Sequence, residues 1–243
     1  MSCRSGRRCA EKPRERIAHC LSLVLNIVLI VGILIFGAIK VAPKVGGGGY
    51  DYRANHYYYD FTSQFDQVVR IDKADICFVG DSLTQLGLWS EFFPGCTVIN
   101  RGIGSDVSEG VLNRLDSVSD CRPDIVFLMI GVNDLATGVP EATTVANVKK
   151  IVESLLVSLP DTTIVIQSVL PAEDVDEVAI LRLNESYEEI ASEYVSVEYL
   201  NLHPLFLVDG ERNADLYSAD GVHLVGAGYE TWLNALLDCP AIE

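Results

Sequence analysis

The chain has 243 residues, 49% of them hydrophobic, which is enough for one sizeable domain with a short appendage but short for two full domains. Its net charge of −16 is unevenly spread, because residues 1–40 hold 7 basic and 2 acidic side chains, whereas residues 41–243 hold 11 basic and 32 acidic ones. A body that carries about −21 charges repels phosphate backbones, so nucleic acid is not expected as a partner or substrate.

The first predicted element is an apolar segment at residues 17–39, which contains no Asp, Glu, Lys or Arg. Because about 20 apolar residues cross the hydrocarbon core of a bilayer, this segment predicts a transmembrane helix. A secretory signal would have a shorter apolar region, of about 7–15 residues, and a small-residue cleavage site, so an uncleaved anchor is favoured. Six basic residues precede the segment, whereas only Lys40 and Lys44 follow it closely. This bias predicts a single-pass protein of the cell membrane, with a cytoplasmic tail at residues 1–16 and an extracytoplasmic body.

Residues 40–56 are predicted to be a flexible tether, because the four glycines at residues 46–49 give the backbone too much freedom for a core. The folded domain is expected to span residues 57–243. An aromatic stretch at residues 50–65 crosses the junction between the two. It could be a platform for a substrate or a helix that packs on the edge of the domain, and the helix is the favoured interpretation.

From Asp75 onward, apolar runs alternate with amphipathic ones, a pattern typical of βαβ units with a parallel sheet. The expected elements are strands at residues 76–79, 97–99, 125–130, 163–169 and 197–200 and helices at residues 107–118, 143–158, 177–194 and 226–237. Five parallel strands with helices on both faces form a three-layer, doubly wound α/β sandwich of the flavodoxin-like type. Because such sheets bind ligands beyond the carboxyl ends of their strands, functional residues are expected directly after strands.

The body contains four cysteines, at Cys77, Cys96, Cys121 and Cys239. An exported domain permits disulfides, but the sequence does not decide whether any of the four pair. Their spacing lacks the C-x-x-C pattern of metal and redox sites. Cys77 lies inside an apolar run and is expected to be a small buried hydrophobe.

The first polar motif after a strand is GDSLT at residues 80–84. A serine on a strand-to-helix turn can expose its hydroxyl at a helix N-terminus, which makes Ser82 the candidate nucleophile. An ordinary helix N-cap, which Ser and Asp commonly provide, would have the same local sequence. Partner residues elsewhere in the chain decide between the two interpretations.

Two further motifs follow the second and third strands. The sequence NRGIGSD at residues 100–106 is a glycine-rich turn that opens a helix, so its backbone N–H groups can face an anion. The sequence GVND at residues 131–134 would bring the neutral amide of Asn133 to the same sheet edge, as oxyanion stabilisation requires. A tight loop and a plain turn are the alternatives for these two motifs.

The last motif places an acid three residues before a histidine, at Asp220 and His223. Such a pair could cap a helix, bind a metal or supply a general base with the acid that orients it. No further cluster of His or carboxylate residues supports a metal site, so neither a metal nor an organic cofactor is expected.

Together these four motifs, in this order and each at a strand end, resemble the SGNH hydrolase superfamily, also called GDSL esterases and lipases. The motifs span residues 80–223, which is nearly the whole body. The resemblance implies Ser82 as nucleophile and His223 as general base. It implies that Asp220 holds the imidazole in the required tautomer.

The resemblance also implies an oxyanion hole, made by the Ser82 backbone N–H, a backbone N–H at Gly104 or Ser105, and the Asn133 side chain. The family commonly has glycine directly before the aspartate of the second motif, where this sequence has Ser105. Serine can still offer its main-chain N–H if its φ and ψ are permitted. The motif aspartates, Asp81, Asp106 and Asp134, are expected to brace loops.

The activity that the resemblance implies is that of a serine ester hydrolase. The compact body leaves little length for a large lid, which favours short acyl groups such as acetyl. With the body tethered outside the membrane, acylated cell-surface carbohydrate is the expected substrate, and a lysophospholipid or other lipid ester is the alternative. An acyltransferase with the same residues, and a non-catalytic surface binding module on the same fold, remain open.

Overall fold

The computed structural model describes residues 51–67 and 71–242. The predicted tail, the predicted span at residues 17–39 and residues 40–50 of the predicted tether lie outside this part. Within it, no helix combines the length and the apolar character that crossing a membrane needs. Most of the rest of the predicted tether belongs to defined elements, because residues 52–54 form a 3-10 helix and residue 56 begins the following α-helix.

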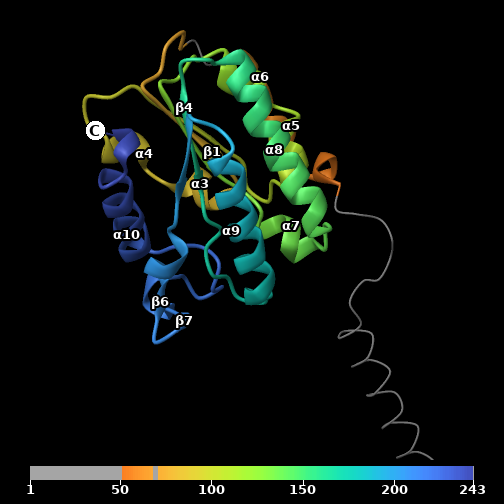
Figure 1. The fold of residues 1–243 in the computed structure, drawn as a ribbon, viewed down its shortest axis with the longest axis vertical. Coiled ribbons are helices and arrows are strands. Elements are labelled where there is room, and N and C mark those ends of the chain that lie inside the picture. Colours follow the sequence, from red (N-terminus) through yellow and green to blue (C-terminus); the bar gives the residue numbers. More distant parts are fainter. Residues whose placement is uncertain (1–50, 68–70, 243) are drawn as a thin grey trace, which may run out of the picture. The chain divides into compact units, whose positions relative to one another are not determined.

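Five parallel strands form the central sheet in the order β2-β1-β3-β4-β5 (Figure 1). Their bounds are β1 (Ile76–Gly80), β2 (Val98–Gly102), β3 (Ile125–Met129), β4 (Thr163–Gln167) and β5 (Val197–Leu200). The chain leaves β1 for β2 at the sheet edge and then returns to β3 on the other side of β1. This strand order is that of flavodoxin-like doubly wound folds, so the predicted α/β class and five-stranded parallel sheet are confirmed.

Side chains of the strands alternate between two separate cores, one on each face of the sheet. Val79 and Leu128 belong to the first core, which α8 (Glu141–Ser158) and α9 (Glu177–Ser192) cover. Phe78 belongs to the second core, which α4 (Trp89–Phe92) and α10 (Gly226–Leu237) cover on the opposite side (Figure 1). Because successive residues of a strand point to opposite faces, an all-apolar strand supplies both cores.

The remaining elements, apart from α2 with its 12 residues, have six residues or fewer. They are η1 (Tyr52–Ala54), α2 (His56–Gln67), α3 (Ser82–Leu86), α5 (Ser108–Leu112), α6 (Asp116–Ser119), α7 (Val132–Thr137), η2 (His203–Phe206), β6 (Leu207–Val208), β7 (Glu211–Arg212), η3 (Ala214–Leu216) and η4 (Pro240–Ile242). The aromatic stretch is the helix α2, as predicted, with Tyr58 buried against the domain and Tyr57 and Tyr59 about half exposed.

The predicted helix at residues 107–118 is wrong in one respect, because the chain forms two short helices, α5 and α6, with a break between them. Two polar side chains at the break bond to nearby carbonyls: Asn113 Nδ2 donates to Glu109 O at 2.7 Å, and Ser117 Oγ donates to Arg114 O at 2.8 Å. Bonds of this kind compete with the helical ladder. At Arg114 the ladder tightens to an i→i−3 bond with the Val111 carbonyl.

Strand β2 also differs from the prediction, because it continues through Asn100, Arg101 and Gly102, which were assigned to the glycine-rich turn. These three residues pair in register with the last three residues of β1. The polar side chains of Asn100 and Arg101 interrupt the apolar pattern but have hydrogen-bond partners next to the strand. Asn100 Nδ2, for example, donates to the Thr84 carbonyl of α3 at 3.0 Å.

The four cysteines of the described part are free thiols. Cys77 is fully buried in the first core, as predicted for a small hydrophobe, and Cys121 and Cys239 are also buried. Cys96 is exposed.

Candidate active site

Ser82 is the first residue of α3 and lies two residues beyond the end of β1. Gly80 permits this tight turn, because a Cβ on it would lie 2.2 Å from the Met129 carbonyl oxygen of the neighbouring strand. Asp81 is the N-cap of the helix, with its Oδ1 accepting the Leu83 N–H at 3.0 Å. The capping role therefore falls to Asp81, and the hydroxyl of Ser82 is left for another partner.

That partner is His223, which lies 141 residues further along the chain. Its Nε2 is 2.9 Å from Ser82 Oγ, and its Nδ1 is 2.7 Å from Asp220 Oδ2. A carboxylate beside Nδ1 stabilises the tautomer with the proton on Nδ1, so Nε2 is the acceptor for the serine hydroxyl. The structure thus brings the three residues predicted as nucleophile, base and orienting acid into one hydrogen-bonded chain.

Asp220 accepts further hydrogen bonds besides the one from His223 Nδ1. Its Oδ1 accepts from Ser218 Oγ at 2.7 Å and from the backbone N–H groups of Val222 and His223, both at 2.9 Å. These bonds, led by the one to the His223 ring, hold the pKa of Asp220 well below its ordinary value. The side chain is half exposed, yet it stays ionised over any pH at which the protein would be assayed.

The glycine-rich turn lies beside Ser82, because a Cβ on Gly104 would be 3.9 Å from the Ser82 Cβ. Ser105 has a φ of 60°, in the left-handed region that favours glycine, so its backbone conformation is costly for a residue with a side chain. The Gly104 N–H already donates to Gln85 Oε1 at 2.7 Å, so it is bonded to α3 instead of facing a substrate.

Asn133 lies near the start of α7, directly after β3, and is part of the same sheet edge. Its Nδ2 donates to the Asp106 carbonyl at 2.9 Å. Because an amide nitrogen carries two hydrogens, this bond fixes the side chain and leaves the second hydrogen for another acceptor.

The motif aspartates brace loops, as expected. Asp134 is fully buried and accepts from the Ser108 hydroxyl at 2.5 Å and from its backbone N–H at 2.9 Å. Asp106 is also fully buried, and its Oδ2 forms an ion pair with Arg114 Nε at 2.8 Å. These carboxylates join the turn after β2 to the elements around it.

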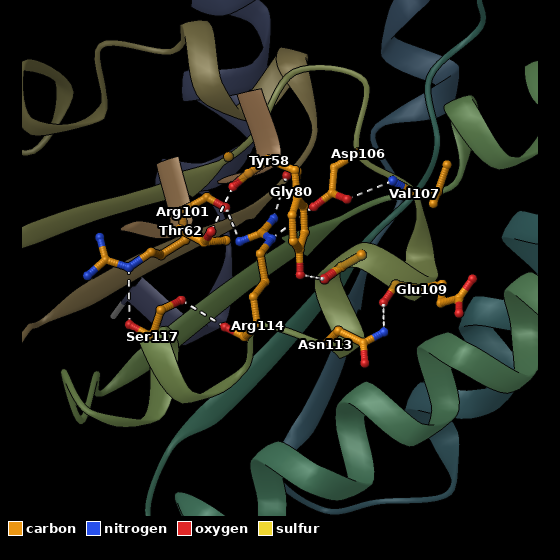
Figure 2. Close-up of polar contacts among 12 residues, drawn as sticks. Tyr58, Thr62, Gly80, Arg101, Asp106, Val107, Glu109, Asn113, Arg114 and Ser117 are labelled. Carbon is orange, nitrogen blue, oxygen red and sulfur yellow. Dashed lines mark hydrogen bonds and ion pairs between the residues drawn. The ribbon is translucent and has the colours of Figure 1, made fainter. Parts of the chain in front are cut away.

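Arg114 organises this edge of the sheet and was missed by the sequence analysis. Besides Asp106, it donates to the Arg101 carbonyl at 2.7 Å and to the Gly80 carbonyl at 3.0 Å (Figure 2). It therefore ties the ends of β1 and β2 to the glycine-rich turn. The sequence held one indication of this role. Arg114 is seven residues after Val107 and so lies on the apolar face of the predicted helix, where a charged side chain is rarely buried without a partner of opposite charge.

Asp81 is a buried carboxyl group beside the candidate nucleophile. It is 1% exposed, and within the described part of the chain its Oδ2 has no hydrogen-bond partner. Burial, opposed by the Leu83 N–H, raises the pKa of Asp81 from 3.8 to about 7. The folded state therefore holds this proton more tightly than the unfolded state does.

Replacing Asp81 with asparagine is expected to change the pH dependence of stability. Below about pH 4, both states of the wild type carry the proton, so the wild type and Asp81→Asn should differ least there. Between pH 4 and about 7 the wild type loses stability as the pH rises, because only its unfolded state releases the proton easily. The difference in Tm should therefore grow by several degrees over this range in favour of the variant and then level off, as circular dichroism melts from pH 4 to 8 would show. An equal difference at pH 4 and pH 8 would contradict the assignment of a raised pKa.

Comparison with known proteins identifies the family of this chain. Residues 78–231 match the GDSL-like Lipase/Acylhydrolase family, and this range covers more than half of the chain. The chain belongs to this family. As a GDSL-type acylhydrolase it is a carboxylic ester hydrolase, and the family range contains all four motifs that the sequence analysis singled out.

Proteins similar to this GDSL-type chain include one named as an acetylhydrolase and one named as a carbohydrate esterase. The alpha1 subunit of platelet-activating factor acetylhydrolase IB from Rattus norvegicus is 29% identical over 173 residues, which are 67% of this chain and 73% of the relative. A solved structure from Streptococcus pneumonia, named for platelet activating factor, is 26% identical with a TM-score of 0.66 and covers 87% of this chain and 98% of its own. A carbohydrate esterase of family 3 from Talaromyces cellulolyticus shares the fold at 16% identity, with a TM-score of 0.56 and coverage of 66% and 93%.

Proposed function

We propose that this acylhydrolase attacks esters with Ser82, using His223 as general base and Asp220 to orient the imidazole. The observation that carries the proposal is the continuous hydrogen-bonded chain from Asp220 through His223 to Ser82. It lies where the fold places its ligands, since Ser82 directly follows β1, next to the point at which the strand order reverses.

The proposed reaction has two halves. His223 Nε2 takes the Ser82 proton as Oγ attacks the ester carbonyl, and the imidazolium then gives this proton to the departing alkoxide. The acyl group is left on Ser82 Oγ. A water molecule, deprotonated by the same Nε2, attacks the acyl carbon and releases the acid, while the ionised Asp220 stabilises the imidazolium in both halves.

The oxyanion of each tetrahedral intermediate is stabilised by hydrogen-bond donors that already point at its position before the reaction. The Ser82 N–H suits this role, because the first N–H groups of a helix have no partner within it. We assign the other two donors to the Ser105 N–H and the Asn133 amide. The Ser105 N–H is chosen because the resemblance to the superfamily implies a main-chain donor directly before the aspartate of this motif, and the Gly104 N–H is bonded to Gln85.

We further propose that the acyl group is short, most naturally acetyl, and that the alcohol part is an extracytoplasmic carbohydrate. The relatives named acetylhydrolases support the acyl size. The strongly acidic body disfavours anionic phospholipid head groups, which supports a carbohydrate over a lipid ester. The location rests on the predicted span at residues 17–39, and a lipid ester is the second candidate.

A series of p-nitrophenyl esters from acetate to decanoate tests the acyl size with the purified full-length protein. We expect kcat/KM to be highest for acetate and to fall at least about tenfold by octanoate, because a pocket for a small acyl group must distort to admit a long chain. Background hydrolysis of each ester is measured with Ser82→Ala. A maximum at octanoate or longer would contradict the acetylesterase proposal and favour a lipid ester.

A further inference from the structure

The peptide groups of the glycine-rich turn are held by side chains from two distant segments. Gln85, on α3, accepts the Gly104 N–H at 2.7 Å. Asn55, between η1 and α2, donates from Nδ2 to the Gly104 carbonyl, also at 2.7 Å. Both faces of the turn are therefore fixed, one by the helix that carries Ser82 and the other by the N-terminal segment at residues 52–67.

The N-terminal segment also packs on both ends of the turn. Ile103 and Val107, which flank the turn, are buried in one cluster with Tyr52 and Tyr58 of the segment. The Tyr58 hydroxyl donates to the Gly110 carbonyl of α5 at 3.3 Å (Figure 2). The segment lies outside the family match at residues 78–231.

Asn55 performs two tasks with two different atoms. Its Oδ1 accepts the Tyr57 N–H at 3.1 Å and so caps the start of α2, while its Nδ2 holds the Gly104 carbonyl. A donor and an acceptor on one short side chain are what an amide offers. The residue therefore joins the start of the N-terminal helix to the turn beside Ser82.

The bond to the Gly104 carbonyl bears directly on the Ser105 N–H, because the two groups belong to the same peptide unit. In a trans peptide the C=O and N–H point in opposite directions, so a donor that fixes the carbonyl also aims the N–H. The φ of 60° at Ser105 is costly for a residue with a side chain, and rotating this peptide unit would relieve it. Asn55 opposes that rotation.

We infer that Asn55 is a positioning residue that aims the Ser105 N–H at the oxyanion. The inference rests on the proposed function, because it assumes attack by Ser82. It predicts that loss of the Asn55 donor lowers the rate of the chemical step more than the affinity for the ester. A merely structural role would instead change stability without this selectivity.

The test uses Asn55→Ser in the full-length protein, since serine keeps a capping oxygen for α2 but cannot reach the Gly104 carbonyl. We expect kcat for p-nitrophenyl acetate to fall about 10-fold to 100-fold, with KM changed less than about twofold, as for a misaimed oxyanion donor. The Ki of a trifluoromethyl ketone, which forms a tetrahedral adduct with a serine, should rise by the same factor as kcat falls.

Two further variants keep the result interpretable. Thr62→Ala is the matched control, because the Thr62 hydroxyl bonds within α2 to the Tyr58 and Tyr59 carbonyls, and it should retain wild-type kcat and Ki. Asn55→Asp is isosteric and keeps the capping oxygen but sets an oxygen against the Gly104 carbonyl, so it should lose at least as much kcat as Asn55→Ser. Wild-type kcat and Ki in both Asn55 variants would overturn the inference, even where Ser82→Ala is inactive and the proposed function stands. Activity that survives in Ser82→Ala would overturn the proposed function itself.

Discussion

Replacing Ser82 with alanine is expected to lower kcat for p-nitrophenyl acetate by about 10⁴-fold to 10⁶-fold. The variant keeps the pair of His223 and Asp220 but lacks the oxygen on which the acyl group is carried. Without this oxygen no acyl-enzyme can form. Only slow, direct hydrolysis of the ester by water beside the oxyanion donors remains. The decisive measurement is the rate of p-nitrophenolate release by the full-length protein.

Ser90→Ala is the control for the loss of a serine hydroxyl, because Ser90 is exposed on α4 and away from the hydrogen-bonded chain. It should keep wild-type activity. A fluorophosphonate probe should label the wild type and Ser90→Ala but not Ser82→Ala, and all three proteins should melt at similar temperatures. Labelling or turnover that persists in Ser82→Ala would assign the nucleophile elsewhere.

The second large effect is expected for Arg114, whose replacement by methionine should reduce the free energy of unfolding by about 3–5 kcal/mol. Arg114 and Asp106 are 3% and 0% exposed, so the variant leaves a carboxylate buried without its cation. It also removes the donors to the Arg101 and Gly80 carbonyls. Urea unfolding followed by circular dichroism measures the loss, provided that the m value is unchanged.

Two comparisons give this prediction its control. Arg53→Met breaks an ion pair of the same length, 2.8 Å, but both partners are more than half exposed, so the free energy of unfolding should change far less than in Arg114→Met. Adding Asp106→Asn to Arg114→Met should cost less than the sum of the two single changes, because the neutral amide no longer needs a cation. A loss for Arg114→Met as small as that for Arg53→Met would mean that the buried pair does not support the fold.

Much of the fold could be predicted because buried parallel strands are continuous apolar runs. The run at residues 125–130 and β3 (Ile125–Met129) agree to within one residue. Prediction failed where polar side chains bond to nearby backbone. Asn100 does so in β2, and Asn113 does so at the break between α5 and α6. In both places the partner is a carbonyl that no hydrophobic pattern reveals.

The residues of the candidate site divide in the same way. Ser82, Asp220 and His223 lie in short sequence motifs, which is why the sequence singled them out. The prediction that each motif lies at a strand end is wrong for Asp220 and His223, because these two residues lie in the loop between η3 and α10. Asn55 and Gln85 belong to no recognisable motif. Each forms a hydrogen bond with a single backbone group of Gly104, which is 49 residues from Asn55 and 19 residues from Gln85 in the sequence. Contacts of that kind become visible only when the turn is seen in place.

The loop that carries Asp220 and His223 is closed on itself. The Ser218 N–H donates to the His223 carbonyl at 2.7 Å, and Tyr217 and Leu224 form an antiparallel bridge at its base. Contacts within the loop therefore fix the position of Asp220 relative to His223. The distance between His223 and Ser82 depends instead on how the carboxy-terminal part of the domain packs on the rest. Turnover should consequently depend on how α10 packs against the sheet, so the rate of catalysis reports on the docking of the carboxy-terminal part of the domain.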